Sequence, residues 1–307
     1  MSGFIERLDL SMIVHEAKPS LNARLVRRVH NSVREFIAPQ SSFGYTCIVA
    51  LGHCLKLRML DLTLIAQSIS LDELFRHLAK LPELIILNLP RTAVVQENAS
   101  TDLNWPKTLE SVSLGGSILD VISQTTVLPP RICDLSISHC PFAQQSSILN
   151  LICRLSHNLT SLSVNYPIRC LAADSLDSIL QLCPKLQYLL VAVDYISAEL
   201  FAEHNSDPKH PLQQLDLDSS GNSGTDIKVC PNDIFNALAE ERLTSLRTVR
   251  VSKRLGWIER RMEDVEDLVD MLEAKAAEAD TSEGVPVGVW EFDSERLRRR
   301  HYESKRP

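Results

Sequence analysis

The sequence is poor in aromatic residues and contains no long apolar run. Phe, Trp and Tyr make up 5% of its 307 residues, so a core would be built from Leu, Ile and Val. No segment approaches the roughly 20 apolar residues that a membrane span needs, and the N-terminus lacks the pattern of a signal peptide. We therefore expect no membrane association and a location in the cytoplasm, the nucleus or both.

The chain also lacks an excess of positive charge and a compact set of cysteines. Its formal net charge is −7, so it gains nothing from phosphate neutralisation and we expect no nucleic-acid partner. The eight cysteines are scattered along the chain, which indicates reduced thiols in an intracellular protein.

Catalytic motifs are missing as well. The sequence has no G-x-S-x-G nucleophile elbow, no phosphate-binding loop, no H-E-x-x-H and no C-x-x-C pair. The adjacent pairs His53-Cys54 and His139-Cys140 would point to opposite faces of a strand and are poorly placed to share one ion. We therefore expect no enzyme activity, no cofactor and no metal.

One short pattern recurs along most of the chain: apolar-x-x-apolar-x-apolar. Eight copies begin at Leu57, Leu84, Leu109, Ile132, Leu159, Leu186, Leu212 and Leu246. The intervals are 27, 25, 23, 27, 27, 26 and 34 residues, and all but the last lie within the period of leucine-rich repeats. A further copy begins at Ile5 and a degraded one at Val33, so we expect about ten repeats.

Each copy alternates like a strand that is buried on one face, and the segments between copies carry helical signals. Ser70 and Glu73 have the spacing of a capping box before an apolar helical face that ends near Leu81. Other helical returns are expected over 21–33, 146–155, 175–182 and 233–239, and an irregular loop over 90–106. The predicted fold is an α/β, right-handed leucine-rich-repeat solenoid, a horseshoe with a parallel inner sheet and outer helices.

The irregular repeat lengths, the opening Cys183-Pro-Lys-Leu186 and the run Ile-Ser-His-Cys-Pro at 137–141 point to a family. In these features the chain resembles the leucine-rich-repeat domain of fungal F-box proteins, over roughly residues 5–255. The resemblance implies a substrate receptor of a cullin-type ubiquitin ligase, in which an F-box docks on the Skp adaptor and the repeats hold the protein to be modified.

The F-box itself is not found in this chain, because the first repeat begins at Ile5 and leaves no room before it. The adaptor would then bind through an F-box upstream, in a longer product. The alternative is a repeat-only scaffold or inhibitor that binds a partner without directing ubiquitination. An activator of small GTPases is a third and more distant possibility, for which no residue stands out.

The chain after the repeats is expected to close the array. We assign residues 1–255 to the solenoid, 256–293 to a C-terminal cap and 294–307 to a basic, disordered tail. The cap would consist of a charged helix over 259–279, which could instead bind a partner, and a short strand within 285–292. The run 219–226 is flexible in composition and is expected to be a surface insertion rather than a functional flap.

Partner binding is expected on the concave face, where the side chains between the buried leucines would point outward. The residues predicted to bind are Met59, Asp61, Ile86, Asn88, Asp134, Tyr188, Leu190, Gln214, Asp216, Asp218 and Arg250. The apolar members would be exposed anchors, unless a neighbouring protomer or the N-terminal edge covers them, and the aspartates at 134, 216 and 218 would favour a basic segment.

Overall fold

The computed structural model describes residues 4–13, 19–94, 103–124, 127–202, 210–278 and 286–293. The chain divides into two compact units, unit 1 (1–155) and unit 2 (156–307). The predicted basic tail, 294–307, lies outside the described residues. The predicted division into solenoid, cap and tail stays a prediction.

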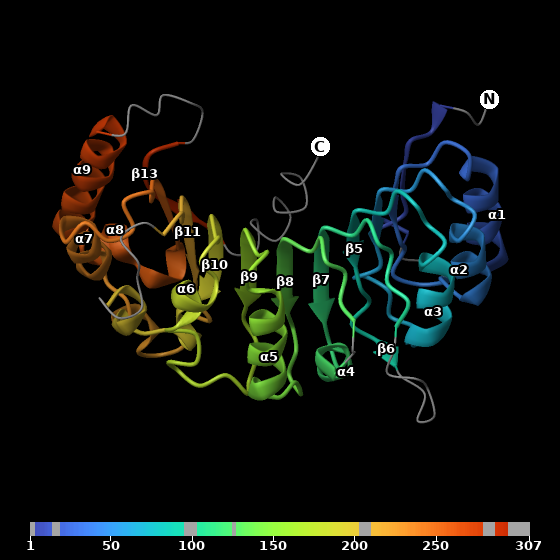
Figure 1. Ribbon diagram of the computed structural model, residues 1–307, viewed down its shortest axis with the longest axis horizontal. Helices are drawn as coiled ribbons and strands as arrows, with labels where there is room; N and C mark the ends of the chain where they lie inside the picture. The colour runs from blue at the N-terminus through green and yellow to red at the C-terminus, as the bar shows by residue number, and fades with distance from the viewer. Residues whose placement is uncertain are drawn as a thin grey trace. The chain divides into compact units, whose positions relative to one another are not determined.

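Unit 1 contains a sheet of six parallel strands among its described residues (Figure 1). In sheet order they are β1 (Arg7–Asp9), β2 (Glu35–Ile37), β3 (Met59–Asp61), β5 (Ile86–Asn88), β7 (Ser111–Gly115) and β8 (Asp134–Ser138). Each of these strands lies within a predicted copy of the repeat or extends one residue beyond it. The α/β class and the parallel pairing of successive copies are therefore confirmed for this unit.

The register of these strands aligns the central leucine of each copy with that of the next. The aligned residues are Leu8, Phe36, Leu60, Leu87, Val112 and Leu135. From Phe36 onward each is 2% exposed or less. The spacing of the motif thus produces a continuous apolar ladder, because equal positions of successive repeats fall side by side.

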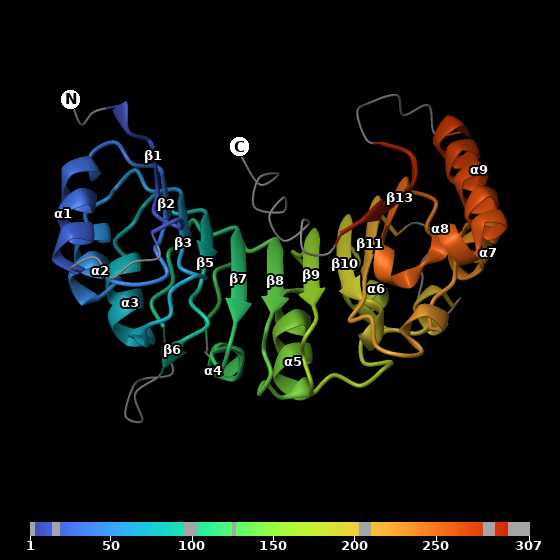
Figure 2. The ribbon, with the colours of Figure 1, turned by 180° about the vertical axis from the view of Figure 1, so that it is seen from behind.

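Helices fill most of the returns between the strands of unit 1. They are α1 (Pro19–Val29), α2 (Tyr45–Leu51), α3 (Leu71–Leu78), α4 (Leu119–Gln124) and α5 (Gln145–Leu155). Figure 2 shows α1, α2 and α3 side by side along one side of the sheet, and α1 and α3 each contact α2.

Three details of unit 1 differ from the predictions. The helices α2 and α4 were not predicted. Helix α3 begins after Ser70 as predicted, but the Ser70 side chain makes no capping hydrogen bond. The return expected to be irregular contains β6 (Ala93–Val94), which pairs with β4 (Ile69–Ser70) in a second, two-stranded sheet. Residues 95–102 of that return lie outside the described part.

Unit 2 contains five parallel strands among its described residues. They are β9 (Ser161–Asn165), β10 (Tyr188–Ala192), β11 (Gln214–Asp218), β12 (Thr248–Ser252) and β13 (Gly288–Phe292). The returns carry α6 (Ile179–Leu182), α7 (Pro231–Ala239) and the 3-10 helices η2 (Val193–Tyr195), η3 (Ala198–Phe201), η4 (Thr225–Ile227) and η5 (Lys253–Leu255). Helix α6 covers only the last half of the return where a longer helix was predicted.

Two further elements follow the last copy of the motif in unit 2. Helix α9 (Met262–Glu278) follows the short helix α8 (Trp257–Arg260) and contacts both α7 and β13. Leu268 and Leu272 of α9 are fully buried, and β13 continues the sheet by pairing with β12. A helix and a strand therefore lie within a few residues of the predicted bounds, and their role as a cap stays a prediction.

The segment 219–226 was expected to be a surface insertion, and its residues 221–224 are exposed, while neighbouring returns contact its first residues. The backbone N–H of Ser220 donates to Asp194 Oδ2 at 3.0 Å. Arg254 Nη1 donates to the carbonyl oxygen of Ser219 at 3.2 Å. These contacts come from the preceding and the following returns, so neighbouring repeats hold the segment in place.

Candidate interaction surface

Side chains alternate between two faces along each strand, which determines where the predicted binding residues lie. The leucines face the helices, and all the predicted residues lie on strands with side chains on the opposite face. Unit 1 carries Met59, Asp61, Ile86, Asn88 and Asp134; unit 2 carries Tyr188, Leu190, Gln214, Asp216, Asp218 and Arg250. Their role in binding stays a prediction.

In unit 2 four of these residues form one hydrogen-bonded group, the Asp216 cluster (Tyr188, Gln214, Asp216 and Arg250). Tyr188 Oη donates to Asp216 Oδ2 at 2.7 Å, and Gln214 Nε2 donates to Oδ1 at 2.9 Å. Arg250 donates from Nε to Oδ1 at 2.7 Å and from Nη2 to Oδ2. Four donors therefore meet one carboxylate, which is as many as its lone pairs accept.

The cluster spans three neighbouring strands. Tyr188 lies opposite Gln214, and Asp216 lies opposite Arg250 in the register of β10, β11 and β12. Asp216 is completely buried, whereas the Arg250 side chain is 31% exposed. Asp216 is thus the central acceptor that holds the aromatic ring and the guanidinium in place.

The protonation states in the cluster are stabilised by its own contacts. Burial, followed by the charge of Asp216, raises the pKa of Tyr188 well above its ordinary value. Burial acts to lower the pKa of Arg250, but the hydrogen bond and charge of Asp216 outweigh it, so this pKa is raised. Tyr188 therefore stays a donor and Arg250 stays charged across the ordinary pH range.

Trp290 lies beside this cluster and was missing from the predicted set. It pairs with Arg250 in the register of β12 and β13, and the residue is 51% exposed. The set stopped at the last recognisable copy of the repeat motif. The signal that could have added Trp290 was its place in the short strand predicted after the capping helix.

Three predicted residues of unit 2 are not exposed, contrary to expectation. Leu190 is 5% exposed, Asp218 4% and Asp216 0%. Asp218 Oδ1 accepts the backbone N–H of Ser219 at 2.8 Å. Cross-strand neighbours cover Asp216, so it does not present a free negative charge. Two of the three carboxylates that were expected to attract a basic segment are therefore buried.

The predicted residues of unit 1 do not form a comparable cluster. Asp61, 1% exposed, accepts the backbone N–H and hydroxyl of Thr63, both at 2.7 Å, and Asn88 Nδ2 at 3.1 Å. Burial raises the pKa of Asp61 despite these hydrogen bonds. Asp61 therefore closes a turn at the end of β3.

The remaining residues of the predicted set in unit 1 are half-buried. Met59 and Ile86 lie opposite each other in β3 and β5. Asp134 accepts the hydroxyl of Ser111 at 2.6 Å. These residues offer a small apolar pair and a paired carboxylate rather than a connected group.

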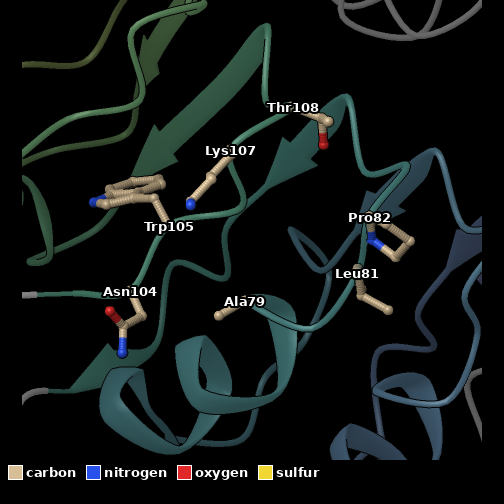
Figure 3. Close-up of a pocket in the computed structure, with 7 residues that line it drawn as sticks. All are labelled: Ala79, Leu81, Pro82, Asn104, Trp105, Lys107 and Thr108. Atoms are coloured by element: carbon tan, nitrogen blue, oxygen red, sulfur yellow. The ribbon is translucent and has the colours of Figure 1, made fainter.

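A hollow of about 380 Å³ lies elsewhere in unit 1 (Figure 3). Its lining residues are Ala79, Leu81, Pro82, Asn104, Trp105, Lys107 and Thr108. Trp105 packs edge-on against Phe75, with ring centroids 4.6 Å apart. Lys107 is the one ionisable residue in this lining, so the hollow holds no acid–base pair, and it contains none of the predicted binding residues.

The described residues carry neither a metal site nor a membrane-spanning helix. They contain no group of three or more His, Cys, Asp or Glu side chains that could hold a metal ion. No helix in the described ranges is long and apolar enough to cross a membrane.

Comparison with known proteins identifies two relatives. No protein-family model matches the chain. The chain is 34% identical over 277 residues to "F-box protein YDR306C" of Saccharomyces cerevisiae, covering 89% of this chain and 58% of that protein. It is 30% identical over 275 residues to "Protein pof5" of Schizosaccharomyces pombe, covering 89% of this chain and 78% of that protein. The chain thus spans little more than half the length of the first relative.

Proposed function

Because the chain belongs to the family of the S. cerevisiae protein YDR306C and the S. pombe protein pof5, we propose that it acts in protein recognition for ubiquitin ligation. In this proposal it is the substrate-recognition part of an F-box-type cullin ligase. The name of the first relative as an F-box protein is the observation that supports this role most directly. We also propose a leucine-rich-repeat solenoid without catalytic activity, in the cytoplasm, the nucleus or both.

The surface that best supports partner binding is the Asp216 cluster together with Trp290. Tyr, Arg and Trp are the residue types that most often dominate binding energy at protein interfaces. Here Tyr188, Arg250 and Trp290 lie on β10, β12 and β13, within four successive strands of one sheet face. Asp216 fixes two of them before any partner arrives, which lowers the entropic cost of ordering side chains on binding.

The ligase role is tested by affinity purification of the tagged product of the longest transcript from its native cells. We expect the Skp adaptor and a cullin to be recovered with it and identified by mass spectrometry. Reproducible absence of both, with other partners still recovered, would favour the second candidate. That candidate is a binding scaffold or inhibitor unconnected to ubiquitination, supported by the same sheet face.

The binding surface is tested separately by the double substitution Arg250→Ala and Trp290→Ala. We expect the principal protein partner to be lost from the purified material while the adaptor is retained, because the two would bind at different places. The matched control is Arg131→Ala with Phe142→Ala, which removes one exposed arginine and one exposed aromatic ring in unit 1. Equal recovery of the partner with both doubles would refute the assignment of this face.

A further inference from the structure

The first strand of unit 1 has an open edge. β1 pairs with β2, and in the part of the chain that the structure describes it has no second neighbour (Figure 2). Glu6 and Leu10 direct their backbone groups toward β2: Glu6 O accepts the N–H of Glu35 at 2.9 Å, and Leu10 N donates to Ile37 O at 3.0 Å. Because backbone groups alternate along a strand, those of Arg7 and Asp9 point to the open edge.

Exposed apolar side chains flank this edge. Phe4 is 91% exposed and Met12 is 89% exposed, more than any other large apolar residue in the described part of the chain. Ile5 is 42% exposed, although the same position in the later copies of unit 1 is fully buried or nearly so. Phe4 and Met12 lie four residues before and four residues after Leu8, so the exposed apolar side chains are placed symmetrically about Leu8.

Arg7 and Asp9 carry opposite charges and lie one residue to either side of Leu8. Arg7 and Asp9 are two residues apart, so their side chains project from the same face of β1. An antiparallel pairing centred on Leu8 would place Arg7 of each copy opposite Asp9 of the other. Phe4 of each copy would then approach Met12 of the other. Opposite charges directly across two antiparallel strands stabilise the pairing. An edge strand that avoids pairing with a second copy of the chain instead carries charges of one sign.

We propose that two copies of this chain associate through β1, in an antiparallel, two-fold symmetric pairing centred on Leu8. The directly opposed residues, Arg7 and Asp9 of the other copy, would exchange backbone hydrogen bonds at the open edge. The present ion pairs of Arg7, with Asp9 at 3.3 Å and Glu35 at 3.4 Å, are partly exposed and worth little, so they do not oppose the exchange.

Charge reversal tests the pairing on the full chain by sedimentation velocity over a concentration series. We expect the wild type to dimerise, and Arg7→Asp or Asp9→Arg alone to weaken the dimer about tenfold or more, because each places like charges opposite each other twice. The Arg7→Asp chain mixed with the Asp9→Arg chain should form a heterodimer, since both facing pairs then have opposite signs. This recovery also shows that each variant is folded.

Controls separate this edge from a general effect of charge. Lys56→Asp and Glu83→Arg make the same charge changes at exposed positions of unit 1 away from β1, and they should leave dimerisation unchanged. The apolar part is tested by Phe4→Ser with Met12→Ser, which should weaken the dimer, against Phe142→Ser, which removes an 81% exposed ring outside the edge.

The outcomes that would overturn the proposal are distinct. A wild-type chain that sediments as a monomer at every concentration rules out the pairing. A dimer that resists both charge reversals, or a mixture of the two variants that stays monomeric, shows that β1 is not the contact.

Discussion

The first and the last repeat of this chain differ in how their apolar cores end. In unit 1 the core stops at β1, where Leu8 is half-buried and Ile5 is 42% exposed. In unit 2 the final copy of the motif, with Leu246 and Val249 fully buried, is followed by β13 and α9. A repeat cannot bury its own leucines, and a strand and a helix beyond the last copy cover them there, whereas no strand of the described residues lies beyond β1.

The largest expected effect comes from truncating the same motif position at the two ends. Leu246→Ala should lower the free energy of unfolding by about 2–5 kcal/mol, because it leaves a cavity in a closed core. Ile5→Ala should cost about 1 kcal/mol or less, since much of the side chain already contacts water. Urea denaturation measures both. A similar loss at the two positions would mean that the first repeat is as closed as the last.

Removal of an aspartate should also lower the free energy of unfolding more in unit 2 than at β1 of unit 1. Asp216→Ala removes the acceptor of four hydrogen bonds and leaves Arg250 without its partner, so we expect a loss of about 2–4 kcal/mol. Asp9→Ala removes an exposed acceptor of Ser11 and should cost about 1 kcal/mol or less. If Asp216→Ala proves as mild as Asp9→Ala in thermal melting, the cluster contributes little to unit 2.

The pH dependence of stability should have opposite signs at two aspartates of unit 1. Burial raises the pKa of Asp61, so its contribution to stability is fully present below the unfolded-state pKa and is lost as the pH rises through the raised folded-state value. For Asp9, burial acts to raise the pKa, but hydrogen bonds from Ser11 outweigh it and the pKa is lowered. That contribution is present above the unfolded-state pKa and is lost as the pH falls.

Matched amide substitutions measure these two signs. Relative to the wild type, Asp61→Asn should become more favourable from acid to neutral pH, whereas Asp9→Asn should become less favourable. Urea midpoints recorded across this range measure both trends. If the two substitutions change stability with pH in the same direction, the pKa values of Asp61 and Asp9 are not shifted in opposite directions.

The smallest expected effect is on the reactivity of the cysteine thiols, which tests whether the core of unit 1 opens locally near β1. Cys47 and Cys54 are fully buried, and burial raises the pKa of Cys54 to about 12, whereas Cys153 is exposed. We expect a thiol reagent to modify Cys153 first and to leave Cys47 and Cys54 unmodified in the folded protein. Peptide mapping by mass spectrometry identifies the order. Early labelling of Cys54 would indicate that unit 1 opens from its first repeat.

Much of the fold could be predicted because the motif repeats. The spacing of Leu57, Leu84 and Leu109 was enough to predict strands that pair in parallel with equal positions aligned. Helix α2 was missed because its N-cap is Gly44, which provides no side chain for a cap, and α4 was missed because it spans only six residues. The irregular lengths of the returns left such short elements without a clear signal.

The binding face could be predicted only in outline. Alternation along a strand placed Tyr188, Asp216 and Arg250 on one face of the sheet, as the structure confirms. It could not determine that Asp216 is completely buried, because the residues that cover it come from β10 and β12, 28 and 34 residues away in sequence. Exposure depends on side-chain contacts between strands, and the pattern within one repeat contains no information on them.

The sequence by itself determined the class of fold, the parallel register and the two faces of the sheet, because a periodic placement of leucines leaves one arrangement that buries them all. Only the tertiary structure decided which polar residues are buried, that Trp290 lies opposite Arg250, and that β1 pairs with one strand among the described residues. Those features arise where side chains from different repeats meet, and where a neighbouring strand is present or missing.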